Sequence, residues 1–266
     1  MSDAGGGLTG SLTGPDGLPV LVLGNSLGTS RMVWDRQVPA LGERFRLLRY
    51  ELPGHGGAAS PQGPIGVGDL GAGVLALLDR HGIEQAAYCG ISLGGMVGMW
   101  LAANAPDRIG ALGLVCTSAY LPPAGGWQDR AAKVRAQGMA SVVGQSIGRW
   151  FPPSFAASEP TLMESFAAEL TSADPAGYAA CCLAIGGMDL RSDLAHVKAP
   201  TLVISGADDP ATPPEHGAAI AAGIGPAGTG TARHIIVAGA HLANVSSAGE
   251  VTDALADHLR VTMQSR

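Results

Sequence analysis

Six short apolar runs recur along the chain, and each is followed by a turn signal and a helical pattern. The runs are nearly continuous rather than alternating, which is typical of parallel strands buried on both faces. We predict strands at Leu18–Leu23, Arg46–Tyr50, Ala86–Gly90, Ala111–Cys116, Thr201–Ser205 and His234–Val237. This alternation predicts an α/β fold with a mostly parallel central sheet flanked by helices.

The stretch from residue 120 to residue 191 departs from this alternation, because no convincing strand pattern occurs there. Its last helical pattern begins with Asp174 as N-cap and Pro175 at the first helical position. The predicted helices are Asp129–Gln137, Met139–Trp150, Leu162–Leu170 and Pro175–Ile185. We therefore expect a core of residues 1–119 and 192–266, with a helical cap (lid) inserted at 120–191. A crossover elaborated without function is the alternative interpretation.

Composition limits the classes of function. Hydrophobic residues make up 46% of the 266 residues and charged residues 14%, which excludes an intrinsically disordered chain. The net charge of −6 and the lack of a basic run argue against a nucleic-acid partner. No export signal and no membrane-spanning stretch is visible, so we expect a cytoplasmic protein without a membrane partner. The sequence does not determine the oligomeric state.

The four cysteines are not arranged like zinc ligands. They are Cys89, Cys116, Cys181 and Cys182, and the last two are adjacent. We expect reduced thiols that pack as small apolar groups, including the two in the predicted cap.

The pattern Gly90-Ile-Ser92-Leu-Gly94 lies between a predicted strand and a predicted helix. In that context it resembles the nucleophile elbow of α/β-hydrolases, a tight turn that exposes a serine at the carboxyl end of the sheet. Side chains at positions 90 and 94 would collide there, which explains the two glycines. G-x-S-x-G also arises by chance in a glycine-rich chain, so the flanking strand and helix carry the prediction that Ser92 is a nucleophile.

A serine nucleophile needs a base and an acid. In α/β-hydrolases the chain order is serine, acid, histidine. Here Asp208 and Asp209 follow the fifth predicted strand, and His241 follows the sixth. The hydrolase pattern at the first of these turns is a glycine, two variable residues and the acid, which favours Asp209 and leaves Asp208 as a solvated turn residue. We predict the catalytic residues Ser92, Asp209 and His241.

The loop after the first predicted strand is expected to donate one backbone N–H to an oxyanion hole. The residue after the nucleophile, Leu93, would donate the other. We assign the first donor to Leu27, with Ser26 as the alternative. Asn25 either orients this loop or touches substrate. His55, in a loop that should border the site, is interpreted as structural, like the other histidines outside the predicted triad.

Within the α/β-hydrolases, the chain resembles the 3-oxoadipate enol-lactonases of aromatic-compound catabolism. The likeness runs from about Leu18 to Leu259. The Asn25-Ser26 loop and the Tyr178-Ala-Ala-Cys-Cys182 segment are more particular to this family than the triad motifs are. Glu51 stands where many relatives carry aspartate. The other resembling segments are Arg49–Gly56, Met32–Gln37, Cys89–Trp100, Ala184–Arg191, Asp209–Pro214 and His241–Val245.

This resemblance implies a small-molecule substrate, an enol-lactone with a carboxylate side arm, that is opened to 3-oxoadipate through an acyl-enzyme on Ser92. It implies no cofactor and no metal. A carboxylate calls for a cation, and the core loops near Ser92 offer none, so we expect Arg130 or Arg135 of the cap to bind it. Trp127 and Trp150 would wall the pocket, with Asn25 and Ser26 as further substrate contacts.

Two other functions stay open at this stage. The first alternative to a lactonase is a different serine hydrolase of this fold, such as a carboxylesterase, a perhydrolase or a carbon–carbon bond hydrolase. The second is a non-catalytic receptor that keeps a ligand pocket. Dehalogenases and epoxide hydrolases of this fold use an aspartate nucleophile, so Ser92 argues against both.

Overall fold

The computed structural model describes residues 8–224 and 230–264. The N-terminal stretch in which we find no export signal therefore lies mostly outside the described residues. No helix within the described ranges is both long and apolar enough to cross a membrane.

Within those ranges, seven strands form one sheet in the order β1-β3-β2-β4-β5-β6-β7. The strands are β1 (Thr9–Thr13), β2 (Val20–Gly24), β3 (Arg46–Glu51), β4 (Ala86–Ile91), β5 (Ile109–Val115), β6 (Thr201–Gly206) and β7 (Ala232–Val237). Only β1 runs antiparallel to its neighbour, and β2, β4, β5 and β6 are buried along their whole length. The predicted α/β fold and its parallel sheet are confirmed.

The strand β1 was missed by the sequence analysis. Its sequence, Thr-Gly-Ser-Leu-Thr, is mostly polar, and its residues are exposed or half-buried at the edge of the sheet. An edge strand that buries little leaves no continuous apolar run in the sequence.

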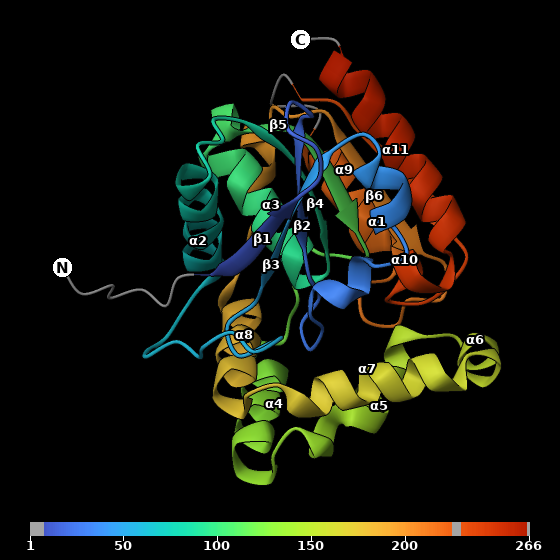
Figure 1. The fold of residues 1–266 in the computed structure, drawn as a ribbon. Helices are drawn as coiled ribbons and strands as arrows, with labels where there is room; N and C mark the ends of the chain where they lie inside the picture. The colour runs from blue at the N-terminus through green and yellow to red at the C-terminus, as the bar shows by residue number, and fades with distance from the viewer. Residues whose placement is uncertain (1–7, 225–229, 265–266) are drawn as a thin grey trace.

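Helices cover both faces of the sheet (Figure 1). On one face α2 (Val67–Arg80) packs against α3 (Leu93–Asn104), and on the other α1 (Val38–Gly42) packs against α11 (Ala248–Gln264). The remaining core helices are α9 (Pro214–Ile224), α10 (Ala243–Ser246) and the short 3-10 helices η1 (Arg31–Trp34), η2 (Pro106–Arg108) and η3 (Asp193–His196).

Five helices between β5 and β6 lie together at one end of the sheet (Figure 1). They are α4 (Ala124–Gln137), α5 (Ala140–Trp150), α6 (Pro153–Ser158), α7 (Pro160–Ser172) and α8 (Pro175–Gly187). A bridge between Tyr120 and Asp189 joins the segments that enter and leave this group. We call residues 120–191 the cap. The sequence analysis missed the short helix α6, which lies between the longer helices α5 and α7.

Candidate active site

Ser92 lies at the turn between β4 and α3 with a backbone φ of 55° and ψ of −118°. Such a conformation costs a non-glycine residue about 1–3 kcal/mol and persists only where the surroundings impose it. Two hydrogen bonds do so here. The Ser92 N–H donates to Val115 O at 3.0 Å, and Thr117 Oγ1 donates to Ser92 O at 2.7 Å. The turn therefore holds the Ser92 side chain at the carboxyl edge of the sheet.

The two glycines of the elbow are required by backbone contacts. A Cβ atom on Gly90 would lie 2.2 Å from Gly94 O, and one on Gly94 would lie 2.3 Å from the carbonyl carbon of Gly24. Real Cβ atoms do not approach backbone so closely. The Gly94 N–H also donates to Asn25 O at 2.9 Å, which ties the elbow to the loop after β2.

Ser92, His241 and Asp209 form a continuous chain of hydrogen bonds. His241 Nε2 lies 2.9 Å from Ser92 Oγ, and His241 Nδ1 lies 2.8 Å from Asp209 Oδ2. All three side chains are buried. The three come from the carboxyl ends of β4, β7 and β6, so the sheet brings together residues that are far apart in the sequence. In this arrangement His241 Nε2 can accept the proton of Ser92, while Asp209 accepts a hydrogen bond from His241 Nδ1 and so orients the ring.

The Asp209 carboxylate is held in place by its own turn. Oδ1 accepts the N–H groups of Ala211 and Thr212, and Oδ2 accepts the Thr212 hydroxyl at 2.6 Å. Burial opposes ionisation, but the neighbouring His241 and the bonds from Thr212 outweigh it and lower the pKa of Asp209 to about 2. The adjacent Asp208 is exposed. Asp209 is therefore ionised and fixed beside His241 at neutral pH.

Several backbone N–H donors near Ser92 have no partner among the described residues. Within the described residues, neither the N–H of Leu27 nor that of Leu93 has a hydrogen-bond partner. In the same loop the N–H of Ser26 is also unpartnered, whereas those of Gly28 and Thr29 are taken. Buried backbone donors are nearly always paired, so unpaired ones beside a serine hydroxyl suit an incoming oxyanion.

The oxyanion loop, by which we mean residues 25–30, is anchored to the core at its start and middle. Asn25 is fully buried, and its Nδ2 donates to Tyr50 O at 2.7 Å. The Gly28 N–H donates to His55 Nε2 at 3.0 Å. The end of β3 and the loop that follows it therefore set the path of the oxyanion loop.

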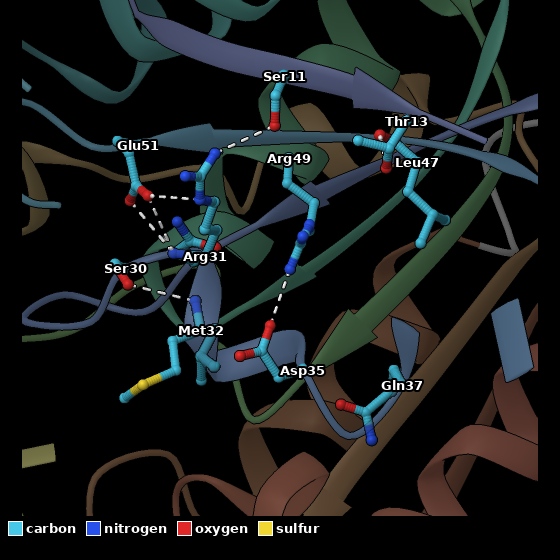
Figure 2. A network of polar contacts seen from close by, with 12 residues as sticks. Ser11, Thr13, Ser30, Arg31, Met32, Asp35, Gln37, Leu47, Arg49 and Glu51 are labelled. Atoms are coloured by element: carbon cyan, nitrogen blue, oxygen red, sulfur yellow. Dashed lines mark hydrogen bonds and ion pairs between the residues drawn. The ribbon is translucent and has the colours of Figure 1, made fainter. Parts of the chain in front are cut away.

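The end of the loop is held by two carboxylates. The Ser30 N–H donates to Glu169 Oε1 of the cap helix α7 at 2.5 Å. The Arg31 N–H donates to Glu51 Oε2 at 3.2 Å, and Figure 2 shows the Arg31 side chain between Glu51 and Ser11. Burial raises the pKa of Glu51 to about 7, although the Arg31 N–H works against that rise. Core and cap thus meet at this loop.

A cavity of about 490 Å³ opens over Ser92 between the sheet edge and the cap. The cap reaches this position because backbone bonds join it to the core. The Leu242 N–H donates to Trp150 O at 3.0 Å, and the Asp174 N–H donates to Gly54 O at 2.8 Å. The lining includes Ser26, Leu27, Ser92 and His241 from the core, and Trp127, Arg130, Trp150 and Tyr178 from the cap.

Arg130 brings a positive charge to this cavity without an acidic partner among the described residues. Its Nε donates to Tyr178 Oη at 2.8 Å, and its terminal nitrogens donate to Gln145 Oε1 at 3.0 Å and Ser146 Oγ at 2.7 Å. All three acceptors are neutral. A guanidinium has five N–H donors, so two remain for an anion.

Two of the predicted substrate contacts do not line the cavity. Arg135 is exposed and does not line the cavity. It lies five positions after Arg130 in α4, which turns it about 140° away on the helix. Asn25 does not line the cavity either, because its side chain is buried against β3. Asn25 therefore orients the loop, the other role that the sequence left open.

Several residues of the site were not predicted. Thr212 binds Asp209, Tyr178 holds Arg130, and Lys133 and Arg149 add charge to the cavity wall. The role of Thr212 has a local sequence signal, because an aspartate in a turn commonly accepts hydrogen bonds from residues two or three positions later. The others come from helices whose orientation no local pattern fixes.

Metal and thiol chemistry find no support among the described residues. No group of three His, Cys, Asp or Glu side chains there is arranged to hold a metal ion. The four cysteines are buried and free, and burial raises the thiol pKa of Cys182 to about 12. Their thiols therefore pack in the interior.

Comparison with known proteins agrees with this geometry. Residues 19–248 match the family described as alpha/beta hydrolase fold. A 3-oxoadipate enol-lactonase of Acinetobacter baylyi is 39% identical over 194 residues, 73% of each chain. The crystal structure of the enol-lactonase from Burkholderia xenovorans superposes with a TM-score of 0.91 at 36% identity, over 95% of this chain and 96% of that one. A thermophilic esterase from Thermogutta terrifontis gives a TM-score of 0.86 at 27% identity, over 96% and 93% of the two chains.

The chain therefore belongs to the α/β-hydrolase family. The resemblance to the 3-oxoadipate enol-lactonases, predicted from the sequence, is confirmed. The fold, the family and these relatives make the chain a hydrolase.

Proposed function

We propose that this hydrolase is a 3-oxoadipate enol-lactonase, a serine hydrolase that opens a five-membered enol-lactone with a carboxylate side arm. One observation carries the proposal: Ser92 and the unneutralised Arg130 line the same cavity. A carboxylate that binds Arg130 is thereby kept in the cavity that holds the nucleophile. The names of the two enol-lactonase relatives support this substrate.

In the first step Ser92 Oγ attacks the lactone carbonyl while His241 Nε2, 2.9 Å away, takes the hydroxyl proton. Asp209 keeps the other nitrogen of His241 protonated and stabilises the imidazolium that forms. The carbonyl oxygen becomes an oxyanion and accepts the N–H groups of Leu27 and Leu93, with Ser26 as the alternative to Leu27. Each such donor lowers the barrier by about 3 kcal/mol.

Collapse of this intermediate breaks the bond to the ring oxygen. His241 returns its proton to that oxygen, so the leaving group departs as an enol that stays joined to the acyl group and tautomerises to a ketone. Water then attacks the acyl-enzyme with His241 as base, and 3-oxoadipate is released. No step needs a metal or an organic cofactor.

In this mechanism the cap selects the substrate. Arg130 binds the side-arm carboxylate, and Trp127 and Trp150 wall the ring. The cap is thus a lid in the functional sense, and the core of residues 1–119 and 192–266 supplies the chemistry. The cytoplasmic location stays a prediction of the sequence.

The test compares kcat/KM for 3-oxoadipate enol-lactone with that for p-nitrophenyl acetate, using Ser92→Ala as control. We expect a preference for the lactone of at least about 100-fold and loss of both activities in the variant. Good ester cleavage with weak lactone turnover would instead favour a general carboxylesterase; the Thermogutta terrifontis relative is named an esterase. Turnover of neither compound, without labelling of Ser92 by a fluorophosphonate, would contradict the hydrolase mechanism itself.

A further inference from the structure

His55 lies under the oxyanion loop and uses both of its ring nitrogens. It is buried in the loop after β3, with 2% of its surface exposed. Nδ1 lies 2.8 Å from Pro53 O, and Nε2 lies 3.0 Å from Gly28 N. The proposed mechanism assigns no role to this histidine.

These two partners fix the protonation state of the ring. Pro53 O only accepts, so Nδ1 carries the hydrogen, and the Gly28 N–H only donates, so Nε2 presents its lone pair. Burial lowers the pKa of His55 to about 4, which keeps this neutral form at neutral pH. His55 is thereby a fixed acceptor for one backbone N–H.

The group that His55 holds is the peptide next to the proposed oxyanion donor. Gly28 follows Leu27 directly and has a φ of 86°, a conformation that favours glycine. The Thr29 N–H is bound to Ser26 O at 3.1 Å. Bonds at positions 28 and 29 therefore leave the N–H groups of Ser26 and Leu27 as the donors of this loop and set their direction.

The cap keeps the ring of His55 from moving. It stacks on Tyr178 with the ring centres 5.9 Å apart and the planes at 29°. A side chain on Gly28 would meet Leu170 of the cap at 2.7 Å. Core and cap thus enclose the bond between Gly28 and His55 from both sides.

We propose that His55 is a positioning residue that aims the oxyanion loop through its bond to the Gly28 N–H. The inference rests on the proposed serine mechanism and not on the identity of the lactone. It implies that losing the acceptor on His55 weakens binding of the transition state and leaves binding of the substrate intact.

The test uses two substitutions of similar size. His55→Leu removes the acceptor, whereas His55→Gln offers a side-chain oxygen at the position of Nε2. With p-nitrophenyl acetate and with the lactone, we expect His55→Leu to lower kcat about 10- to 100-fold with KM changed less than about threefold, as for a misplaced oxyanion donor. We expect His55→Gln to restore kcat to within about fivefold of the parent.

His258→Gln is the matched control, because His258 also meets a backbone carbonyl, Leu112 O at 3.1 Å, but lies on α11 away from the cavity. It should alter thermal stability without altering kcat. An unchanged kcat in folded His55→Leu, or equal losses in the Leu and Gln variants, would overturn the proposal. Turnover of the ester but not of the lactone would reject the proposed substrate alone, since the ester still tests His55.

A second measurement covers the case in which His55→Leu does not fold. In the unaltered protein, a phenylboronic acid adduct on Ser92 places an oxygen in the oxyanion hole. We expect the nitrogen NMR signals of the His55 ring to show the Nδ1–H form and to shift on adduct formation, while those of His258 stay in place. An adduct that leaves the His55 signals unmoved would refute the positioning role.

Discussion

The sheet edge and the cap hold their side chains at the site in different ways. At the sheet edge, backbone geometry sets the position of the side chains: Ser92 has a positive φ, and Gly94 packs directly against the end of β2. In the cap, side-chain contacts set the position, since Arg130 donates to the side chains of Tyr178, Gln145 and Ser146. Catalysis tolerates little displacement of the reacting groups, which suits a nucleophile positioned by the backbone. Selection of the substrate suits a residue such as Arg130 that is positioned by side chains.

The difference extends to the glycines of the elbow and of the cap helix α5. Glycines of the elbow have backbone atoms within 3 Å of the position that a Cβ would take, whereas Gly144 and Gly148 of α5 have nothing within 4 Å. The first group is required by packing, and the second is not. Four predictions break or sharpen this comparison, each with a matched second variant.

The largest effect is expected at Asp209. Asp209→Asn removes the acceptor that fixes the ring form of His241, so we expect kcat to fall about 10⁴-fold. Asp208→Asn, one residue away and exposed, should change kcat less than about twofold. Steady-state kinetics on either substrate measure both. Equal losses in the two variants would show that the assignment of the acid to Asp209 is wrong.

Alanine at glycine positions should separate the two regions by stability. Gly94→Ala places a Cβ against the backbone of Gly24, and we expect it to lower the free energy of unfolding by about 3 kcal/mol or to prevent folding. Gly148→Ala, in an open position of α5, should raise it by about 0.5–1 kcal/mol through helix propensity. Urea denaturation measures both values. A stable Gly94→Ala variant would contradict the packing argument for the elbow.

Arg130→Ala tests whether the cap selects the carboxylate. Loss of a charge-assisted contact should raise KM for the lactone about 10- to 100-fold and leave KM for p-nitrophenyl acetate unchanged. Arg135→Ala, on the same helix but outside the cavity, should change neither. If Arg130→Ala keeps the parent KM for the lactone, the assignment of the carboxylate to this residue fails.

The smallest effect concerns Glu51 and pH. Its pKa is raised by burial from 4.5 to about 7, so the folded state holds a proton that the unfolded state releases between these values. This contribution to stability is complete below pH 4.5 and is lost as pH rises through about 7. The melting temperature should therefore fall more between pH 5 and pH 7.5 for the parent protein than for Glu51→Gln. The exposed Glu215→Gln should follow the parent, and a parallel fall in all three proteins would exclude Glu51 as the cause.

The sequence carries the fold because burial on both faces leaves continuous apolar runs, and β2, β4, β5 and β6 were found on that basis. It also located Ser92, Asp209 and His241, since each sits at a strand end within a short local pattern. The structure brings these three side chains into hydrogen-bond distance. An edge strand such as β1, with little burial, left no such pattern.

What the sequence could not decide depends on how helices pack in space. The choice between Arg130 and Arg135 follows from the face that α4 turns to the cavity, and that face is set by the packing of α4 on the cap helices α8 and α5. Asn25 and His55 act through partners on β3 and in the oxyanion loop, more than twenty residues away. Local sequence patterns indicate only the structure that neighbouring residues determine. The roles of these residues depend on contacts that form when the sheet and the cap pack against the oxyanion loop.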